Sequence, residues 1–211
     1  MNFLHRIPLR AFCLLYPCKI YGKKNLPNGR AVLVSNHFSA LDCGFIAKVY
    51  NKDIKFLAKK EIFKNKFISW LIKSFGGIPI DRDKPDMKSL VTAIKVLKEE
   101  HKLAIFAEGT RNKSGTDELQ PIKGGAIVFA VKTKSPIVPI MILKKLRFMR
   151  KTPLIVGEPF ELSEYYDKKY GEKELLEMEE IVAEKMRALH GQLKEIVNNK
   201  KNRKKSKKDK K

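Results

Sequence analysis

The feature that most constrains the fold is an alternation between short apolar runs and longer amphipathic stretches. The runs are only a few residues long, which is typical of buried strands, and segments with helical periodicity separate them. The runs that we expect to form strands are 31–34, 54–57, 78–80, 103–106, 137–142 and 154–156. Strands that alternate with helices predict an α/β fold, with a largely parallel central sheet flanked by helices.

The length of 211 residues fits a single structural domain. We divide the chain into an N-terminal amphipathic segment (1–22), a central domain (23–160), a C-terminal helical region (161–198) and a basic tail (199–211). A charged amphipathic helix is expected from 172 to about 197. The tail is rich in lysine and nearly free of apolar residues, so we expect it to be disordered.

One predicted strand end carries a His and an Asp. The run 31–34 leads into Asn36 and His37, and Ser39 can cap the helix that carries Asp42 in its first turn. A carboxylate there can accept one imidazole N–H and leave the other ring nitrogen as a base. Such a pair suits an enzyme whose substrate supplies the reacting hydroxyl. The simpler interpretation is an Asp that caps a helix and a His at a strand end.

Two further strands end in charged residues, and a lysine follows nearby: the residues are Asp81, Arg82, Glu108, Gly109, Thr110, Arg111 and Lys123. In an open α/β sheet, sites form at the carboxyl ends of the strands. Arg82 and Arg111, with Lys123, would clamp a phosphate, and Gly109 would let backbone N–H groups approach it. The site would then fit an acceptor with both a phosphate and a free hydroxyl. Each charge taken alone is equally compatible with a surface ion pair or a satisfied strand-end carboxylate.

Charge points to an anionic partner. The chain has 45 basic and 23 acidic residues, a formal net charge of +22, and its tail holds nine Lys or Arg and one Asp. Nucleic acid, an anionic lipid surface and a phosphorylated substrate all fit such an excess. The sequence contains no zinc-finger, RNA-recognition or helix-turn-helix pattern, so we expect no nucleic-acid partner.

The cysteines and histidines do not indicate a metal centre. Cys13, Cys18 and Cys43 are odd in number and lack metal-ligand or redox spacing, which indicates a reduced chain. Cys43 follows Asp42 and could act as a nucleophile, although a small packed helix residue is the simpler interpretation. We expect neither a metal nor a cofactor.

Several segments have the composition of a membrane surface, yet no apolar run reaches the roughly 20 residues that a transmembrane helix needs. Segment 1–22 mixes apolar and basic residues, which suits either an interfacial helix or a helix docked on the domain. The segment 63–75 is rich in Phe and includes Trp70, so it packs inward or lies on headgroups. The basic tail is either solvated or held by anionic lipid.

Four ordered blocks resemble the glycerolipid acyltransferase family, which includes 1-acyl-glycerol-3-phosphate acyltransferases. The blocks are NHFSALD (36–42), GGIPIDR (76–82), FAEGTR (106–111) and IVPI (137–140). The resemblance covers about residues 20 to 160, which makes 23–160 the expected catalytic domain. Ala107 replaces the usual Pro, and Pro79 stands where an aromatic or apolar residue is common. Neither departure removes a charged group.

The resemblance implies a mechanism. His37 would take the proton of the acceptor hydroxyl, and Asp42 would orient His37 and stabilise its cation. The hydroxyl oxygen would attack an acyl thioester directly, without an acyl-enzyme. The acceptor phosphate would be held by Arg82, Arg111 and Lys123, and Glu108, Gly109 and Thr110 would shape the substrate site. Pro139 would be architectural.

The resemblance also implies the partners. The acceptor would be a lysophospholipid, with glycerol-3-phosphate or another lysolipid as the alternative. The donor would be acyl-CoA or an acyl-carrier protein. We expect the enzyme at the cytoplasmic face of the cell membrane, peripheral or monotopic, on an anionic lipid surface. A basic nucleic-acid-binding protein is the alternative outside enzymes.

Overall fold

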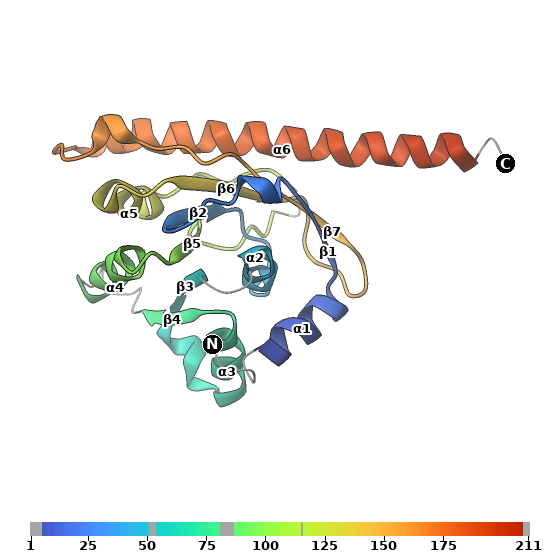
Figure 1. Ribbon diagram of the computed structural model, residues 1–211, viewed down its shortest axis with the longest axis horizontal. Coiled ribbons are helices and arrows are strands. Elements are labelled where there is room, and N and C mark those ends of the chain that lie inside the picture. Colours follow the sequence, from blue (N-terminus) through green and yellow to red (C-terminus); the bar gives the residue numbers. More distant parts are fainter. Residues whose placement is uncertain (1–5, 51–53, 81–86, 115, 209–211) are drawn as a thin grey trace.

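The computed structural model describes residues 6–50, 54–80, 87–114 and 116–208, built around a seven-stranded sheet (Figure 1). The strands are β1 (Cys18–Tyr21), β2 (Ala31–Ser35), β3 (Ile54–Lys59), β4 (Gly77–Ile80), β5 (Lys102–Phe106), β6 (Ile137–Ile142) and β7 (Thr152–Val156). Each predicted run lies within one of them. β1 was not predicted, because its four residues are mostly half-buried and alternate in polarity instead of forming a continuous apolar run.

The strands lie in the order β1-β7-β6-β2-β5-β3-β4. Five of them, from β6 to β4, run parallel to one another, whereas β7 is antiparallel to β6 and parallel to β1. The predicted α/β fold with a largely parallel sheet is therefore confirmed. β4 is an edge strand, which suits Pro79, because proline has no backbone N–H to donate to a second neighbouring strand.

Alternate residues of β2 point to opposite faces of the sheet and into two separate cores. Val32 and Val34 join the core beneath α4 (Met87–Lys98), α5 (Gly125–Thr133) and α6 (Glu172–Lys208). The neighbours Ala31 and Leu33 join the core beneath the other helices, which are α1 (Arg6–Leu15), α2 (Asp42–Tyr50) and α3 (Lys66–Ser74). Short 3-10 turns complete the described elements, at η2 (Lys23–Asn25), η3 (Lys60–Lys64) and η4 (Ser163–Tyr165).

The N-terminal helix α1 is docked on the domain by one aromatic side chain. Phe12 is 7% exposed, and its ring lies within 5.6 Å of the rings of Tyr16, Phe45 and Phe75, measured between centroids. At its end, Leu14 and Leu15 remain 75% and 44% exposed. The docked alternative is thus confirmed for the face that carries Phe12, whereas an interfacial role for the exposed leucines stays a prediction.

Helix α3 divides its aromatic residues in the same way. Leu71 packs against the core, and Phe75, which ends the helix, is 3% exposed. Phe67 and Trp70 lie on the outer side with 69% and 41% of their surfaces exposed, and their rings are 6.0 Å apart.

Helix α6 is longer than the sequence predicted. Its first part packs on the sheet through Met178, Val182, Met186, Leu189 and Leu193, and the rest extends past the domain (Figure 1). We expected disorder from residue 199, but the helix continues to Lys208, since Lys and Arg are good helix formers even without apolar contacts. In the described part of the chain, no helix is both long and apolar enough to cross a bilayer.

Candidate active site

The site is built where β2 ends, and Asn36 fixes that end. Its side-chain amide donates to the carbonyl oxygen of Ile142 (2.9 Å) and its oxygen accepts the N–H of the same residue (2.8 Å). This two-way pairing continues the contact between β2 and β6 beyond the last paired residues. The chain leaves the sheet at a defined angle, so His37 begins a loop with a fixed direction.

His37 and Asp42 form the predicted pair. His37 Nδ1 lies 3.1 Å from Asp42 Oδ2, and the backbone N–H groups of Phe38 and Ser39 each donate to the same oxygen at 2.7 Å. Asp42 is fully buried, and its Oδ1 has no hydrogen-bond partner among the described residues. Three donors on one carboxylate oxygen stabilise the anion and hold the imidazole in one orientation.

The His37 ring lies against Phe106, the last residue of β5. The ring centroids are 3.8 Å apart and the planes differ by 14°, which is a stacked arrangement. The side chain remains 15% exposed, and the described residues make no hydrogen bond to Nε2. Stacking and the Asp42 contact therefore hold the ring in place, and they leave its second nitrogen without a hydrogen-bond partner among the described residues. We did not predict the role of Phe106, which depends on the pairing of β2 with β5.

Glu108 lies directly beneath this loop. It is 3% exposed, and its Oε1 accepts the backbone N–H of His37 at 3.3 Å, while Oε2 has no partner among the described residues. Burial, helped by the negative charge of Asp42, raises the pKa of Glu108 to about 7, although the His37 N–H opposes the shift. Glu108 thus changes its charge near neutral pH at the back of the site.

The loop after β5 carries the next predicted residues. Gly109 has a φ of +68°, and a Cβ there would lie 2.8 Å from the Lys123 side chain, so glycine is required both for the backbone and for the passage of Lys123. Its N–H donates to Phe106 within a turn and is therefore engaged by the protein. Thr110 and Arg111 are exposed. The N–H of Asn112 donates to the carbonyl oxygen of His37 at 2.7 Å, which ties Arg111 to the His37 loop.

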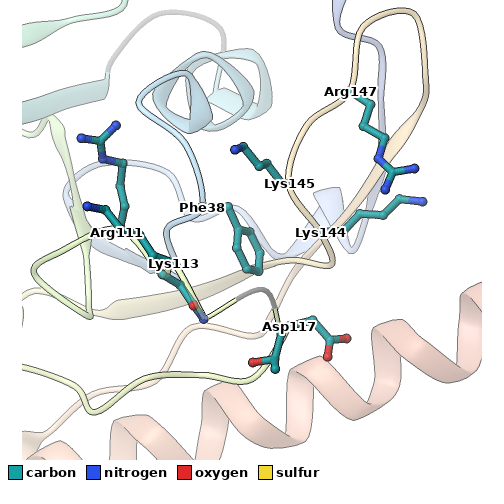
Figure 2. A pocket seen from close by; sticks show the side chains of 9 residues that line it. Phe38, Arg111, Lys113, Asp117, Lys144, Lys145 and Arg147 are labelled. Atoms are coloured by element: carbon teal, nitrogen blue, oxygen red, sulfur yellow. The ribbon is translucent and has the colours of Figure 1, made fainter.

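A cavity of about 630 Å³ opens beside this loop (Figure 2). It is lined by Phe38, Arg111, Asn112, Lys113, Thr116, Asp117, Lys144, Lys145 and Arg147. Its acidic residue, Asp117, pairs with Lys194 and His190 of α6. The remaining charges are positive, and Phe38 places them next to His37. A cavity of this kind can hold an anionic group beside an imidazole base.

Sequence reasoning found only Arg111 among these cations. Lys144, Lys145 and Arg147 belong to the loop between β6 and β7, and nothing in their local sequence relates them to His37. Only the adjacency of β6 and β2 brings that loop to the site. Arg82 and Asp81 lie outside the described residues.

Cys43 does not act as a nucleophile in this arrangement. Its Sγ contacts the carbonyl oxygen of Ala40 at 3.3 Å. Desolvation of the thiol, with the nearby charge of Asp42, raises its pKa to about 12. A protonated thiol is a poor nucleophile, so the packing interpretation holds.

Comparison with known proteins gives the family. The family model described as "Acyltransferase" matches residues 17–143, which is more than half of the chain. The chain belongs to the acyltransferase family. The match contains β2, β5 and β6, and so the residues that form the His37 site, but it ends within the loop that supplies Lys144, Lys145 and Arg147.

The acyltransferase is similar to several characterised relatives. It is 33% identical over 187 residues to the 1-acyl-sn-glycerol-3-phosphate acyltransferase of Bacillus subtilis, covering 85% of this chain and 88% of that protein. The protein of the same name from Helicobacter pylori is 33% identical over 60% of this chain and 54% of its own length. The crystal structure of the 1-acyl-sn-glycerophosphate acyltransferase PlsC from Thermotoga maritima superposes with a TM-score of 0.63 at 26% identity, covering 89% of this chain and 78% of that one.

Proposed function

We propose that this acyltransferase moves a fatty acyl group from a thioester to the sn-2 hydroxyl of 1-acyl-glycerol-3-phosphate, which makes phosphatidic acid for phospholipid synthesis. The observation that carries the proposal is the position of an immobilised imidazole, His37, beside a cavity lined by Arg111 and further cations. A base and a cationic cavity carried by neighbouring residues fit an acceptor with a hydroxyl and a phosphate. The names of the relatives support the same acceptor.

The geometry of the His37–Asp42 pair supports a direct acyl transfer. Asp42 holds Nδ1, so Nε2 takes the proton of the acceptor hydroxyl. The oxygen attacks the thioester carbonyl, the C–S bond breaks, and the imidazolium returns the proton to the departing thiolate. Asp42 stabilises the cation between these two steps. The acceptor supplies the nucleophile, so no covalent acyl-enzyme is required.

The phosphate of the acceptor is assigned to the cationic side of the cavity. Arg111 is the first candidate, because its guanidinium can bind two phosphate oxygens at once. Lys123, which crosses Gly109, is a second candidate, and Arg82 is a third on the strength of its sequence block alone. Glu108, Gly109 and Thr110 would shape the glycerol site.

Arg111→Ala should separate acceptor binding from chemistry. Loss of a charge-assisted contact weakens binding by roughly 10- to 100-fold, so the acceptor KM should rise by about that factor with a smaller change in kcat. Steady-state kinetics with lysophosphatidic acid measures both. Arg187→Ala is the matched control, since Arg187 is an exposed arginine of α6 paired with Glu180. An unchanged acceptor KM in Arg111→Ala would remove its role as a clamp.

The enzyme and its substrates are tested together in one assay. The purified chain should convert lysophosphatidic acid and either acyl-CoA or acyl-carrier protein to phosphatidic acid, and the two donors are compared at equal concentration. Glycerol-3-phosphate and other lysolipids are then offered in competition. Preferential acylation of one of these would replace the proposed acceptor, and no transfer from either donor would contradict the proposal.

The lipid acceptor implies a place at the membrane. We assign the enzyme to the cytoplasmic face as a peripheral or monotopic protein, supported by its net charge of +22 and by exposed Phe67 and Trp70 on α3. Recovery of the full chain wholly in the soluble fraction at low salt would count against this location.

A further inference from the structure

The loop between β6 and β7 ends in a turn that places apolar residues where polar ones are usual. Arg150 N–H donates to the carbonyl oxygen of Arg147 at 3.2 Å, so Phe148 and Met149 are the two central residues of the turn. Such positions normally hold Gly, Asn, Asp or Pro. Here Phe148 and Met149 are 63% and 64% exposed, and Met149 has a φ of +55°. The structure thus maintains an unfavourable conformation with two large apolar side chains in water.

The turn is attached to the end of α1. Met149 N–H donates to the carbonyl oxygen of Leu15 at 2.8 Å, and the Phe148 ring meets Tyr16 edge-on with centroids 6.1 Å apart. Leu14 and Leu15, the exposed leucines of α1, therefore adjoin the turn, and the loop reaches the end of α1 in Figure 1. We call Leu14, Leu15, Phe148 and Met149 the apolar tip.

Cations flank Phe148 and Met149 in the chain. The eight residues from 144 to 151 include five exposed basic residues and no acidic one: Lys144, Lys145, Arg147, Arg150 and Lys151. None of the five forms an ion pair with the described part of the chain. Isolated exposed apolar residues are ordinary, but a contiguous apolar group rimmed by unpaired cations is the composition of a surface that binds anionic lipid headgroups.

The same loop also lines the catalytic cavity. Lys144, Lys145 and Arg147 are lining residues together with Phe38 and Arg111 (Figure 2). Phe148 and Met149 of the apolar tip follow Arg147 directly in the chain. A loop that binds the bilayer with its tip would hold the cavity at the lipid surface, where a lysophospholipid acceptor is dissolved.

We propose that the apolar tip inserts into the headgroup layer of an anionic bilayer, with the flanking cations on lipid phosphates, and so positions the catalytic cavity at the membrane. This inference rests on the proposed function in one respect, namely that the acceptor is a lipid dissolved in the bilayer. Insertion itself requires no turnover and is measured separately.

Vesicle flotation of the full chain tests whether the apolar tip and its neighbouring cations bind anionic lipid. Phe148→Ser with Met149→Ser should weaken binding to vesicles of phosphatidylglycerol and phosphatidylcholine by roughly 10- to 100-fold, since two apolar side chains leave the lipid. Arg150→Gln with Lys151→Gln should weaken vesicle binding by about fivefold for each charge removed. Leu176→Ser and Val91→Ser are the controls, because both residues are 58% exposed and lie on α6 and α4. Wild-type affinity in both tip variants would overturn the proposal.

Fluorescence reports whether the tip enters the lipid. Phe148→Trp is made together with Trp70→Phe, so that the only tryptophan is at the tip. Brominated acyl chains should quench its emission on anionic vesicles, and Leu176→Trp in the same background should be unaffected. Absence of quenching in vesicle-bound protein would contradict insertion.

Activity separates this proposal from the proposed function. The Phe148→Ser, Met149→Ser double variant should lose activity on a long-chain acceptor in vesicles and retain it on a dispersed short-chain acceptor. If the wild type acylates neither acceptor, the proposed function fails. The vesicle-binding data still show whether the apolar tip binds the membrane. If the variant binds vesicles normally but loses turnover with an acidic carrier protein as donor, the surface is a protein-docking site and the membrane proposal is wrong.

Discussion

At the scale of single residues, the site depends on one buried carboxylate that serves two purposes. Asp42 accepts the N–H groups of Phe38 and Ser39, which shapes the loop, and it also faces His37 Nδ1. Its spacing from His37 places the carboxylate in the first turn of α2 while the imidazole stays on the loop. The simpler interpretation of Asp42 as a helix cap is not what the structure shows, because both N–H groups that it accepts precede α2 and belong to the His37 loop.

Asp42→Asn tests the second role. The amide oxygen can still accept backbone N–H groups, so the fold should survive, but a neutral side chain no longer stabilises the imidazolium. We expect kcat to fall by roughly 10²- to 10⁴-fold with little change in acceptor KM. Circular dichroism checks that the variant is folded, and steady-state kinetics measures kcat and the acceptor KM. A folded variant with near wild-type kcat would show that Asp42 only shapes the loop.

Glu108→Gln tests the charge at the back of the site. The pKa of Glu108 is raised from its ordinary value of 4.5 to about 7, so the folded state holds a proton that the unfolded state releases between these values. This carboxyl group therefore makes stability fall as pH rises from 4.5 to 7, and Gln removes that contribution. Urea unfolding at several pH values should show that the free energy of unfolding falls less between pH ~5 and ~8 in Glu108→Gln than in the wild type. An identical pH dependence in both proteins would contradict the assignment.

At the scale of elements, helices α1 and α3 lie on the same face of the sheet and distribute their apolar residues in the same way. α1 and α3 each bury an aromatic residue, Phe12 and Phe75, and each leave apolar residues exposed on the opposite side. Composition revealed the mixture of apolar and basic residues in both segments. It did not reveal which residues would be buried, because that depends on where each helix meets the sheet.

Phe12→Ala and Leu14→Ala should distinguish the two faces of α1. Phe12 packs against three other rings, so its truncation should cost about 3–5 kcal/mol of unfolding free energy. Leu14 is 75% exposed, and Leu14→Ala should change stability by less than about 0.5 kcal/mol. Denaturant unfolding measures both. Equal losses would mean that α1 is not docked through Phe12.

At the scale of the whole molecule, the sequence was most informative where burial is complete. β2, β5 and β6 are covered on both faces, so each contains an apolar run of at least four residues that is easily recognised. β1 was missed because it is a half-buried edge strand, and the end of α6 because its lysines resemble a disordered tail.

The candidate site was predictable only in part, for a related reason. His37 and Glu108 follow two strands whose carboxyl ends lie at the same edge of a parallel sheet, and Asp42 lies five residues after His37 in the chain. The cations of the loop between β6 and β7 lie about a hundred residues from His37 and become neighbours only through the strand order. Their number and charge were visible in the sequence, but their position was not.

The central claim is that His37 is the base that activates the acceptor hydroxyl beside the cationic cavity. The most direct measurement is phosphatidic acid formation from lysophosphatidic acid and an acyl thioester by purified wild type and His37→Ala. We predict a loss in kcat on the order of 10²- to 10⁴-fold in a variant with wild-type circular dichroism. Near wild-type turnover by folded His37→Ala would contradict the account.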